Sequence, residues 1–229
     1  MCFDPSLISL LPPLPPGVWN DAHISRDPKT GGTRFSFVSK ENLLGITDTW
    51  HPTRIDHLML EEKEKLRSNV YEVTCPVLES NKTIIAKFAR FEWEIAQLQA
   101  ETTAYKWIEG QQIGPEFLGH LTEEGRVIGF LISKIENCRH AEFEDLSLCE
   151  EVLLRLHRLG IRQGDTNKQN FLVHDGKTTL IDFDCASRVE ESEKLEVKFR
   201  GLGEKLLATS GRGRIIESDS THIARITYK

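Results

Sequence analysis

The chain has 229 residues, of which 39% are hydrophobic and 28% are charged, and its formal net charge at pH 7 is −6. This composition is typical of a globular protein, and no run approaches the roughly 18 apolar residues of a membrane-spanning helix. The acidic balance gives no general reason to bind nucleic acid or an anionic membrane surface, so we expect neither as a partner.

The N-terminal segment is apolar and rich in proline, but it lacks the basic start and the small-residue cleavage site of a secretory signal. The five cysteines are scattered without a C-x-x-C pair, which argues against a disulfide framework and against a structural zinc site. We therefore expect a cytoplasmic protein with reduced thiols.

Residues 1–60 show no pattern that indicates a function, and we assign them to an N-terminal extension. The prolines of residues 10–16 (LLPPLPP) favour an extended conformation that packs along a surface. The same residues match the P-x-x-P pattern of SH3 ligands, which keeps a protein partner open as an alternative. Residues 34–39 (RFSFVS) alternate loosely like a strand.

A segment rich in strand signals follows. Val70–Thr74 and residues 83–88 are β-rich runs separated by a polar stretch, and they predict neighbouring antiparallel strands. Residues 91–108 carry apolar side chains at helical spacing and predict one amphipathic helix. A hairpin around Gly125 comes next, with residues 127–132 as its apolar second strand.

The character of the chain changes beyond residue 137. Apolar residues between 148 and 156 predict a second helix, with Gly160 at its left-handed C-terminal cap. A polar loop follows, and two β-rich runs then flank Asp175-Gly176, a dipeptide suited to a tight hairpin turn. Residues 195–207 predict one last helix. This order of elements predicts an α+β fold.

Two charged residues stand in apolar surroundings. Lys87 lies inside the apolar strand IIAKF, where an unpaired ammonium group would be costly to desolvate. Glu101 projects from the apolar face of the predicted helix, since apolar residues lie three or four positions to either side of it. We expect these side chains to form an inward-facing ion pair. A purely structural ion pair, or a lysine that reaches toward solvent, is the alternative.

The polar loop and the hairpin after it bring together three oxygen-bearing side chains. Asp165 and Asn170 lie five residues apart in the loop, and Asp182 ends the second strand of the hairpin. Asp165 can accept or orient a hydroxyl proton, while Asn170 and Asp182 offer the hard oxygen ligands that suit Mg²⁺ on phosphates. Each residue alone also fits a turn former or a solvated acid, so it is the set of three that indicates a site.

The ordered motifs IIAK, QAETTAYKWI, QGDTNKQN and LIDFD resemble those of the protein-kinase-like superfamily, especially its aminoglycoside and choline phosphotransferase branch. The resemblance covers about residues 64–190. It implies a two-lobed fold, with a small antiparallel-sheet N-lobe at residues 61–136 and a truncated helical C-lobe at residues 137–229.

The resemblance also implies a role for each motif residue. Lys87 would hold the α- and β-phosphates of ATP and pair with Glu101. Asp165 would be the catalytic base, and Asn170 and Asp182 would bind Mg²⁺. ATP and Mg²⁺ are therefore the expected cofactors.

Two further segments are assigned to the nucleotide by the same resemblance. Residues 131–137, which include Lys134 and Glu136, resemble the hinge that binds adenine through its backbone. The segment LRSNV, where the family has a glycine-rich loop over the phosphates, contains no glycine. We expect Ser68 and Asn69 to substitute there.

The catalytic motifs depart from the family pattern at two places. Gln163 and Gly164 replace the usual His-Arg, and Asp184 replaces the glycine of D-F-G. Asp184 could assist a metal or face solvent. His157 matches a histidine near the end of the helix before the catalytic loop, and we expect its role to be structural.

The motifs predict an ATP-dependent phosphotransferase acting on a hydroxyl group of an acceptor, in particular of a small metabolite. The short region after Asp182 contains no A-P-E sequence, which disfavours an ordinary protein kinase. That brevity also resembles compact atypical kinases, which work within a protein assembly and act chiefly as ATPases. A nucleotide-binding pseudokinase is the alternative from another class, favoured by the glycine-free loop and by Gln163.

Overall fold

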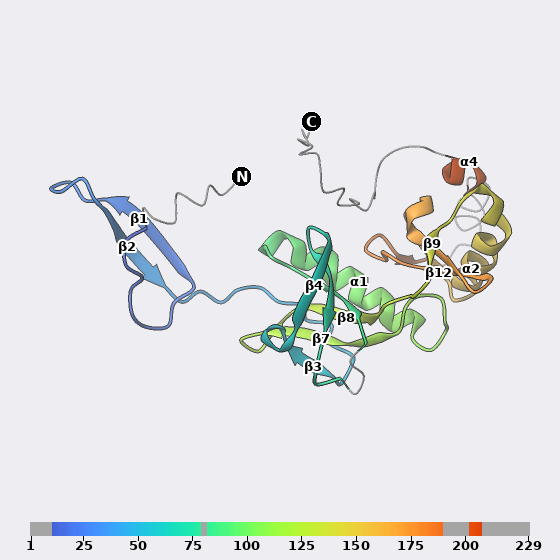
Figure 1. Ribbon diagram of the computed structural model, residues 1–229, viewed down its shortest axis with the longest axis horizontal. Helices are drawn as coiled ribbons and strands as arrows, with labels where there is room; N and C mark the ends of the chain where they lie inside the picture. Colours follow the sequence, from blue (N-terminus) through green and yellow to red (C-terminus); the bar gives the residue numbers. More distant parts are fainter. Residues whose placement is uncertain (1–10, 79–81, 190–201, 208–229) are drawn as a thin grey trace. The chain divides into compact units, whose positions relative to one another are not determined.

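The computed structural model describes residues 11–78, 82–189 and 202–207 (Figure 1). By its internal contacts the chain divides into two units, Met1–Leu44 and Gly45–Lys229. In the first unit, β1 (Asp21–Arg26) and β2 (Thr33–Ser39) form an antiparallel hairpin, which confirms the strand predicted at residues 34–39. Residues 11–16 of the proline-rich segment are neither helix nor strand, and residue 10 lies outside the described residues.

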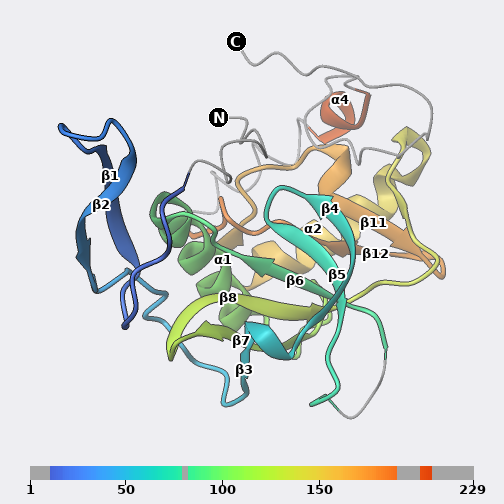
Figure 2. The same cartoon turned by 60° about the vertical axis from the view of Figure 1, so that its left-hand side comes forward.

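A six-stranded sheet with the order β3-β7-β8-β6-β5-β4 is the centre of the second unit (Figure 2). Its strands are β3 (Arg54–Asp56), β4 (Glu61–Arg67), β5 (Val70–Thr74), β6 (Ile84–Phe88), β7 (Phe117–Glu123) and β8 (Arg126–Ser133). Neighbouring strands are antiparallel except β3 and β7, which are parallel. The predicted pairing of β5 with β6 and the predicted hairpin around Gly125 are confirmed.

Residues 45–60 correct the predicted N-terminal boundary. They were assigned to the extension, but they belong to the second unit and supply strand β3. The side chains of Ile46 and Ile55 are buried, and the Ile46 N–H donates to the carbonyl of Val127 at 2.8 Å. A three-residue strand gives too short a period to be recognised in the sequence.

Two longer helices, α1 (Ile95–Ile108) and α2 (Leu146–Arg158), match the two predicted ones, and the sheet with these helices makes an α+β structure. Of the predicted last helix, the structure describes α4 (Leu202–Leu207), and residues 195–201 lie outside the described residues. The 3-10 turns are His57–Met59, Glu92–Glu94, Phe143–Asp145 and Lys168–Asn170. Within the described parts of the chain, no helix has the length and apolar character needed to cross a membrane.

Five short strands precede or follow α2 in the sequence. They are β9 (Arg139–His140), β10 (Ile161–Arg162), β11 (Phe171–His174), β12 (Lys177–Leu180) and β13 (Ser187–Arg188). The predicted hairpin at Asp175-Gly176 is confirmed as β11 and β12, which pair in an antiparallel way. The second strand ends at Leu180, so Asp182 follows the strand instead of ending it.

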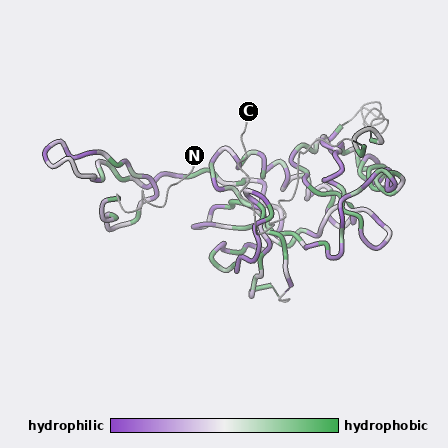
Figure 3. Tube along the Cα trace, turned by 45° about the horizontal axis from the view of Figure 1, so that its top comes forward, coloured by the Kyte–Doolittle hydropathy of each residue, from purple (hydrophilic) through white to green (hydrophobic). Residues whose placement is uncertain are grey.

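Buried side chains cover both faces of the six-stranded sheet. One core cluster joins α1 and β8 to α2, β11 and β12, and the other packs on strands β3, β5, β6, β7 and β8. Figure 3 shows hydrophobic and hydrophilic residues changing repeatedly along the trace, as expected of elements with one buried face. Gly129 allows β6 and β8 to lie close, since a Cβ there would be 2.1 Å from the carbonyl oxygen of Lys87.

His120 in β7 is a buried histidine held in its neutral form. Its side chain is fully buried between Trp50 and Phe117, and its Nε2 accepts a hydrogen bond from the backbone N–H of His51 at 3.2 Å. Burial lowers the pKa of His120 to about 4, and the nearby charges of His51 and Arg54 act in the same direction.

We predict that the second unit loses stability as the pH falls from about 6.5 to about 4. Over this window an unfolded histidine, with a pKa of about 6.5, binds a proton that folded His120 does not bind. The contribution of this group is about 1.4 kcal/mol per pH unit. Chemical denaturation at several pH values should show that His120→Phe flattens this dependence, while the exposed-residue control His23→Asn keeps it. An unchanged slope in His120→Phe would assign the pH dependence to other groups.

Candidate nucleotide and phosphate site

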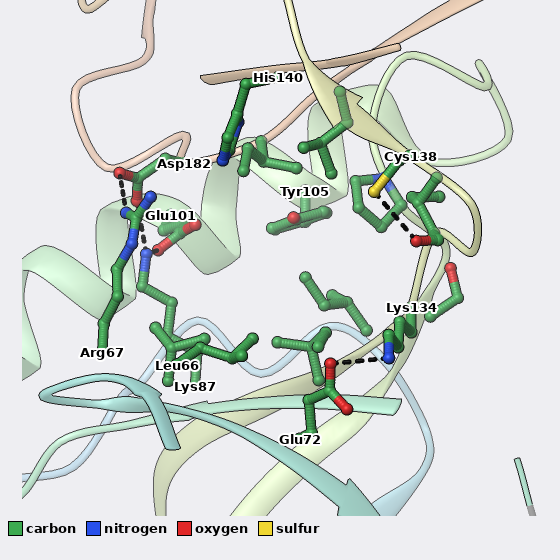
Figure 4. Close-up of a pocket in the computed structure, with 18 of the residues that line it drawn as sticks. Leu66, Arg67, Glu72, Lys87, Glu101, Tyr105, Lys134, Cys138, His140 and Asp182 are labelled. Carbon is green, nitrogen blue, oxygen red and sulfur yellow. Dashed lines mark hydrogen bonds and ion pairs between the residues drawn. The ribbon is translucent and has the colours of Figure 1, made fainter. Parts of the chain in front are cut away.

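A cavity of about 270 Å³ opens in the second unit between the six-stranded sheet on one side and β9, β11 and the segment after β12 on the other (Figure 4). Its middle is lined by apolar side chains, among them Leu66, Val70, Ile85, Ile132, Leu172 and Ile181. Charged side chains stand at two opposite ends. One end holds Arg67, Lys87, Glu101 and Asp182, and the other holds Glu72 with Lys134.

Lys87 and Glu101 form the predicted ion pair. Strand alternation in β6 turns Ile84 and Ala86 toward one core cluster and Lys87 toward the cavity. In α1, Glu101 lies on the buried face between Leu98 and Tyr105. The Lys87 ammonium lies 2.5 Å from Glu101 Oε2, and the side chains are only 11% and 2% exposed.

Asp182 is a second carboxylate on the same ammonium group. Its Oδ1 accepts from Lys87 Nζ at 2.6 Å, and its Oδ2 lies 3.5 Å from the guanidinium of Arg67. Four elements distant in sequence, β4, β6, α1 and the segment after β12, therefore meet at one charged cluster. Arg67, Lys87, Glu101 and Asp182 are called the charged cluster below.

The charged cluster shifts the pKa of its members in different directions. Burial would lower the pKa of Lys87, but the charges of Glu101 and Asp182 outweigh it and raise that pKa above its usual value. Burial raises the pKa of Glu101, and Lys87 offsets only part of this effect. For Asp182, burial acts to raise the pKa, yet Lys87 and Arg67 hold it below its usual range. Asp182 is thus an ionised carboxylate at neutral pH, as a metal ligand must be.

The backbone of Asp182 is in the left-handed region, with a φ of 64°, which is uncommon for a residue other than glycine. Neighbouring groups hold it on both sides. Gln163 Nε2 donates to the carbonyl oxygens of Ile181 and Asp182, at 3.1 and 3.0 Å. The N–H of Phe183 donates to Glu101 Oε1 at 3.3 Å, and its ring packs edge-on against Tyr105 with centroids 5.2 Å apart. Strained backbone held in this way is typical of functional sites.

The Gln163-Gly164 departure has a structural explanation. Gln163 is buried, and its amide supplies the two donors that fix the Asp182 segment. Gly164 has a φ of 78°, and a Cβ at this position would lie 2.1 Å from the carbonyl oxygen of Cys185. The close approach of the two segments therefore excludes any side chain at residue 164.

Asp165 and Asn170 lie beside the cavity but do not line it. Asp165 is exposed, and its carboxylate accepts from the N–H and the Nδ2 of Asn167, at 3.3 and 2.9 Å. Asn170 is buried, with its Nδ2 donating to the Asp165 carbonyl at 3.3 Å and its own carbonyl accepting from Ile181 at 3.0 Å. The loop and the Asp182 segment are thus joined through the backbone.

Three of the residues assigned to the nucleotide lie away from the cavity walls. Ser68 and Asn69 form the turn between β4 and β5, and their side chains do not line the cavity. Glu136 does not line it either, whereas Lys134 does. Ser68 and Asn69 are therefore not part of the cavity wall, and their contact with phosphates stays a prediction.

Sequence reasoning missed several polar side chains that line the cavity, among them Arg67, Glu72, Tyr105, Arg139 and His140. Glu72 pairs with Lys134 at 2.7 Å, and this hydrogen bond raises the pKa of Lys134. The hydroxyl of Tyr105 and Nδ1 of His140 are buried and have no hydrogen-bond partner among the described residues. The alternation of β5, which places Glu72 on the same face as Val70, is the sequence signal that could have indicated Glu72 as a lining residue.

Asp184, in place of the glycine of D-F-G, is held by α1. Its carboxylate accepts a hydrogen bond from the side-chain amide of Gln97. His157 in α2 has a pKa that is lowered by burial, in line with the structural role expected of it. The Asp184 contact joins the segment after β12 to α1.

The oxygen donors near the charged cluster suit a hard cation. The carboxylate of Asp182 and the side-chain amide of Asn170 offer oxygen ligands of the kind that Mg²⁺ takes together with phosphate oxygens. No group of three or more His, Cys, Asp or Glu that could hold a metal by itself occurs in the described part of the chain. One carboxylate and one amide oxygen match the few protein ligands that Mg²⁺ takes where phosphate oxygens complete its coordination.

Comparison with known proteins gives no further guide: no protein-family model matches the chain, and no curated protein matches it significantly.

We predict that Lys87→Met lowers the free energy of unfolding by roughly 3–5 kcal/mol, because it leaves the buried carboxyl group of Glu101 without its ammonium partner. The double variant Lys87→Met/Glu101→Leu should recover much of this loss, since an apolar pair of similar volume can replace a buried ion pair. Lys106→Met, which removes an exposed partner of Asp48, is the control and should cost less than about 1 kcal/mol. Equal losses in Lys87→Met and Lys106→Met, measured by urea denaturation, would contradict the buried pair.

Proposed function

We propose that this chain is an ATP- and Mg²⁺-dependent phosphotransferase that moves the γ-phosphate of ATP to a hydroxyl group of a small metabolite in the cytoplasm. The observation that carries the proposal is the charged cluster at one end of an apolar cavity. Apolar walls suit a nucleobase, and a cationic end beside an ionised carboxylate suits phosphates with a metal.

The proposal treats residues 61–136 and 137–229 as the two lobes of a kinase-like fold, with the nucleotide between them. Support comes from the cavity walls, which are contributed by β4, β5, β6 and β8 on one side and by β9, β11 and Asp182 on the other. The stretch 131–137, which resembles the adenine-binding hinge, contributes Ile132, Ser133, Lys134 and Ile135 to the wall away from Lys87.

Each residue of the site then has a defined task. Lys87, positioned by Glu101, holds the phosphates next to the apolar pocket. Asn170 and Asp182 would hold Mg²⁺, which when bound neutralises and bridges phosphate oxygens. Gln163 and Phe183 keep the Asp182 backbone in place through the contacts described above.

We assign to Asp165 the task of binding the hydroxyl group of the phosphate acceptor. Its carboxylate is exposed and is oriented by two hydrogen bonds from Asn167, so it can meet a hydroxyl group that arrives from solvent. From there it would accept or orient the hydroxyl proton as the oxygen attacks the γ-phosphate.

A nucleotide-binding pseudokinase is the second candidate. It is favoured by the turn between β4 and β5, which is short and has no glycine, and by Asp182, whose two oxygens face Lys87 and Arg67. In such a protein the charged cluster would bind nucleotide without turnover.

We predict that Asp165→Asn and Asp182→Asn fail in different ways. Asp165→Asn should keep Mg²⁺-dependent ATP binding but slow turnover by about 100-fold or more, because it removes general-base assistance. Asp182→Asn should weaken Mg²⁺-dependent ATP binding as well as turnover, because it removes a charged metal ligand. Calorimetry measures the binding, and phosphate transfer or slow ATP hydrolysis measures the turnover.

The control is Asp175→Asn, which removes a carboxylate at the exposed turn between β11 and β12 and should leave both readouts unchanged. ATP binding without any turnover that depends on Asp165 would favour the pseudokinase. No ATP binding at millimolar concentration with Mg²⁺ present would contradict both candidates.

A further inference from the structure

The hairpin of β4 and β5 ends in a turn that cannot enclose phosphates with its backbone. Arg67 pairs with Val70, so only Ser68 and Asn69 lie between the two strands. The carbonyl of Asn69 accepts from the N–H of Phe88 at 3.1 Å, which fastens the turn to β6. A loop that cradles phosphates needs several consecutive N–H groups directed at the ligand, and a two-residue turn does not supply them.

Arg67 is the last residue of β4, and its side chain lines the cavity, which the residues of the turn do not. Its side chain is 30% exposed and lines the cavity, and its Nη1 lies 3.5 Å from Asp182 Oδ2 (Figure 4). That distance is at the outer limit of a hydrogen bond. Among the described residues, the Asp182 carboxylate is the one hydrogen-bond and ion-pair partner given for the Arg67 side chain, so most of the guanidinium donors are left for another acceptor.

The charge balance of the cluster indicates the chemistry of such an acceptor. The charged cluster contains two cations, Arg67 and Lys87, and two carboxylates, Glu101 and Asp182, so it is balanced without a ligand. A divalent cation on the Asp182 carboxylate would take the anion that Arg67 now faces. The guanidinium would then stand beside like charge unless it turned to a phosphate, whose oxygens its planar fork matches.

His140 completes this wall of the cavity. It lines the same end as Arg67 and Asp182, and its Nδ1 is buried without a hydrogen-bond partner among the described residues. Burial, with the Arg67 charge acting in the same direction, lowers the pKa of His140. A neutral imidazole adds no competing charge next to the guanidinium.

We propose that Arg67 binds the nucleotide phosphates through its side chain, in the task that a glycine-rich loop would perform through its backbone. The inference rests on the proposed nucleotide site and names a residue of that site that the sequence motifs do not include. On this account the contact between Arg67 and Asp182 belongs to the ligand-free state, and Arg67 exchanges the carboxylate for phosphate when Mg²⁺ and nucleotide bind.

The test compares Arg67→Ala, Arg67→Lys and the control Lys65→Ala by calorimetry with ATP and with adenosine, each in the presence of Mg²⁺. Lys65 lies on the same strand and does not line the cavity, so Lys65→Ala removes one positive charge from outside it. We expect Arg67→Ala to weaken ATP binding roughly 10- to 100-fold and to change adenosine binding less than about twofold. Arg67→Lys should fall between, because it keeps the charge without the planar fork.

The outcomes separate this inference from the proposed function. If the unmodified chain binds ATP and Arg67→Ala binds it equally well, Arg67 is not a phosphate ligand and the nucleotide site still stands. Equal losses for ATP and adenosine would assign Arg67 to the shape of the cavity, which also overturns the inference. If the unmodified chain binds neither ligand, the proposed function fails together with it.

Discussion

The ammonium group of Lys87 is the constraint on which the site depends. It lies on a central strand of the sheet with only 11% of its side chain exposed, so it must be paired with carboxylates to remain there. Glu101 fixes α1 to this strand, and Asp182 fixes the segment after β12 to it. One buried charge therefore sets the relative positions of a helix, a strand and a loop.

Asp182 is held in a left-handed backbone conformation, which is unfavourable for a residue other than glycine. Its φ of 64° is stabilised by the Gln163 amide on one side and by the contacts of Phe183 with α1 on the other. Gly164 permits the two segments to come this close. Gln163 and Gly164, which differ from the His-Arg that the resemblance implies, are thus the residues that adapt the loop to the Asp182 segment.

Much of this arrangement can be predicted from the sequence, because periodicity and the burial of charge follow simple physical rules. Periodicity predicts the main strands and helices, and the free energy of burying a charge predicts the pairing of Lys87 with Glu101. The place of Arg67 in the cavity wall could not be predicted, because a charged residue at the end of a strand usually faces solvent. Strand β3 was missed because its position is set by parallel pairing with β7, a contact distant in sequence. The two-residue turn at Ser68 and Asn69 could not be predicted either, because a motif aligns residues without giving the length of the turn.

The central claim is that the charged cluster holds the phosphates of a nucleotide together with Mg²⁺. A crystal structure grown with Mg²⁺ and a non-hydrolysable ATP analogue tests it most directly. The account predicts density for the base among the apolar cavity walls, phosphates beside Lys87, and a metal ion in contact with Asp182. Density for the analogue at another site, with Lys87 and Asp182 still paired as they are without ligand, would contradict it.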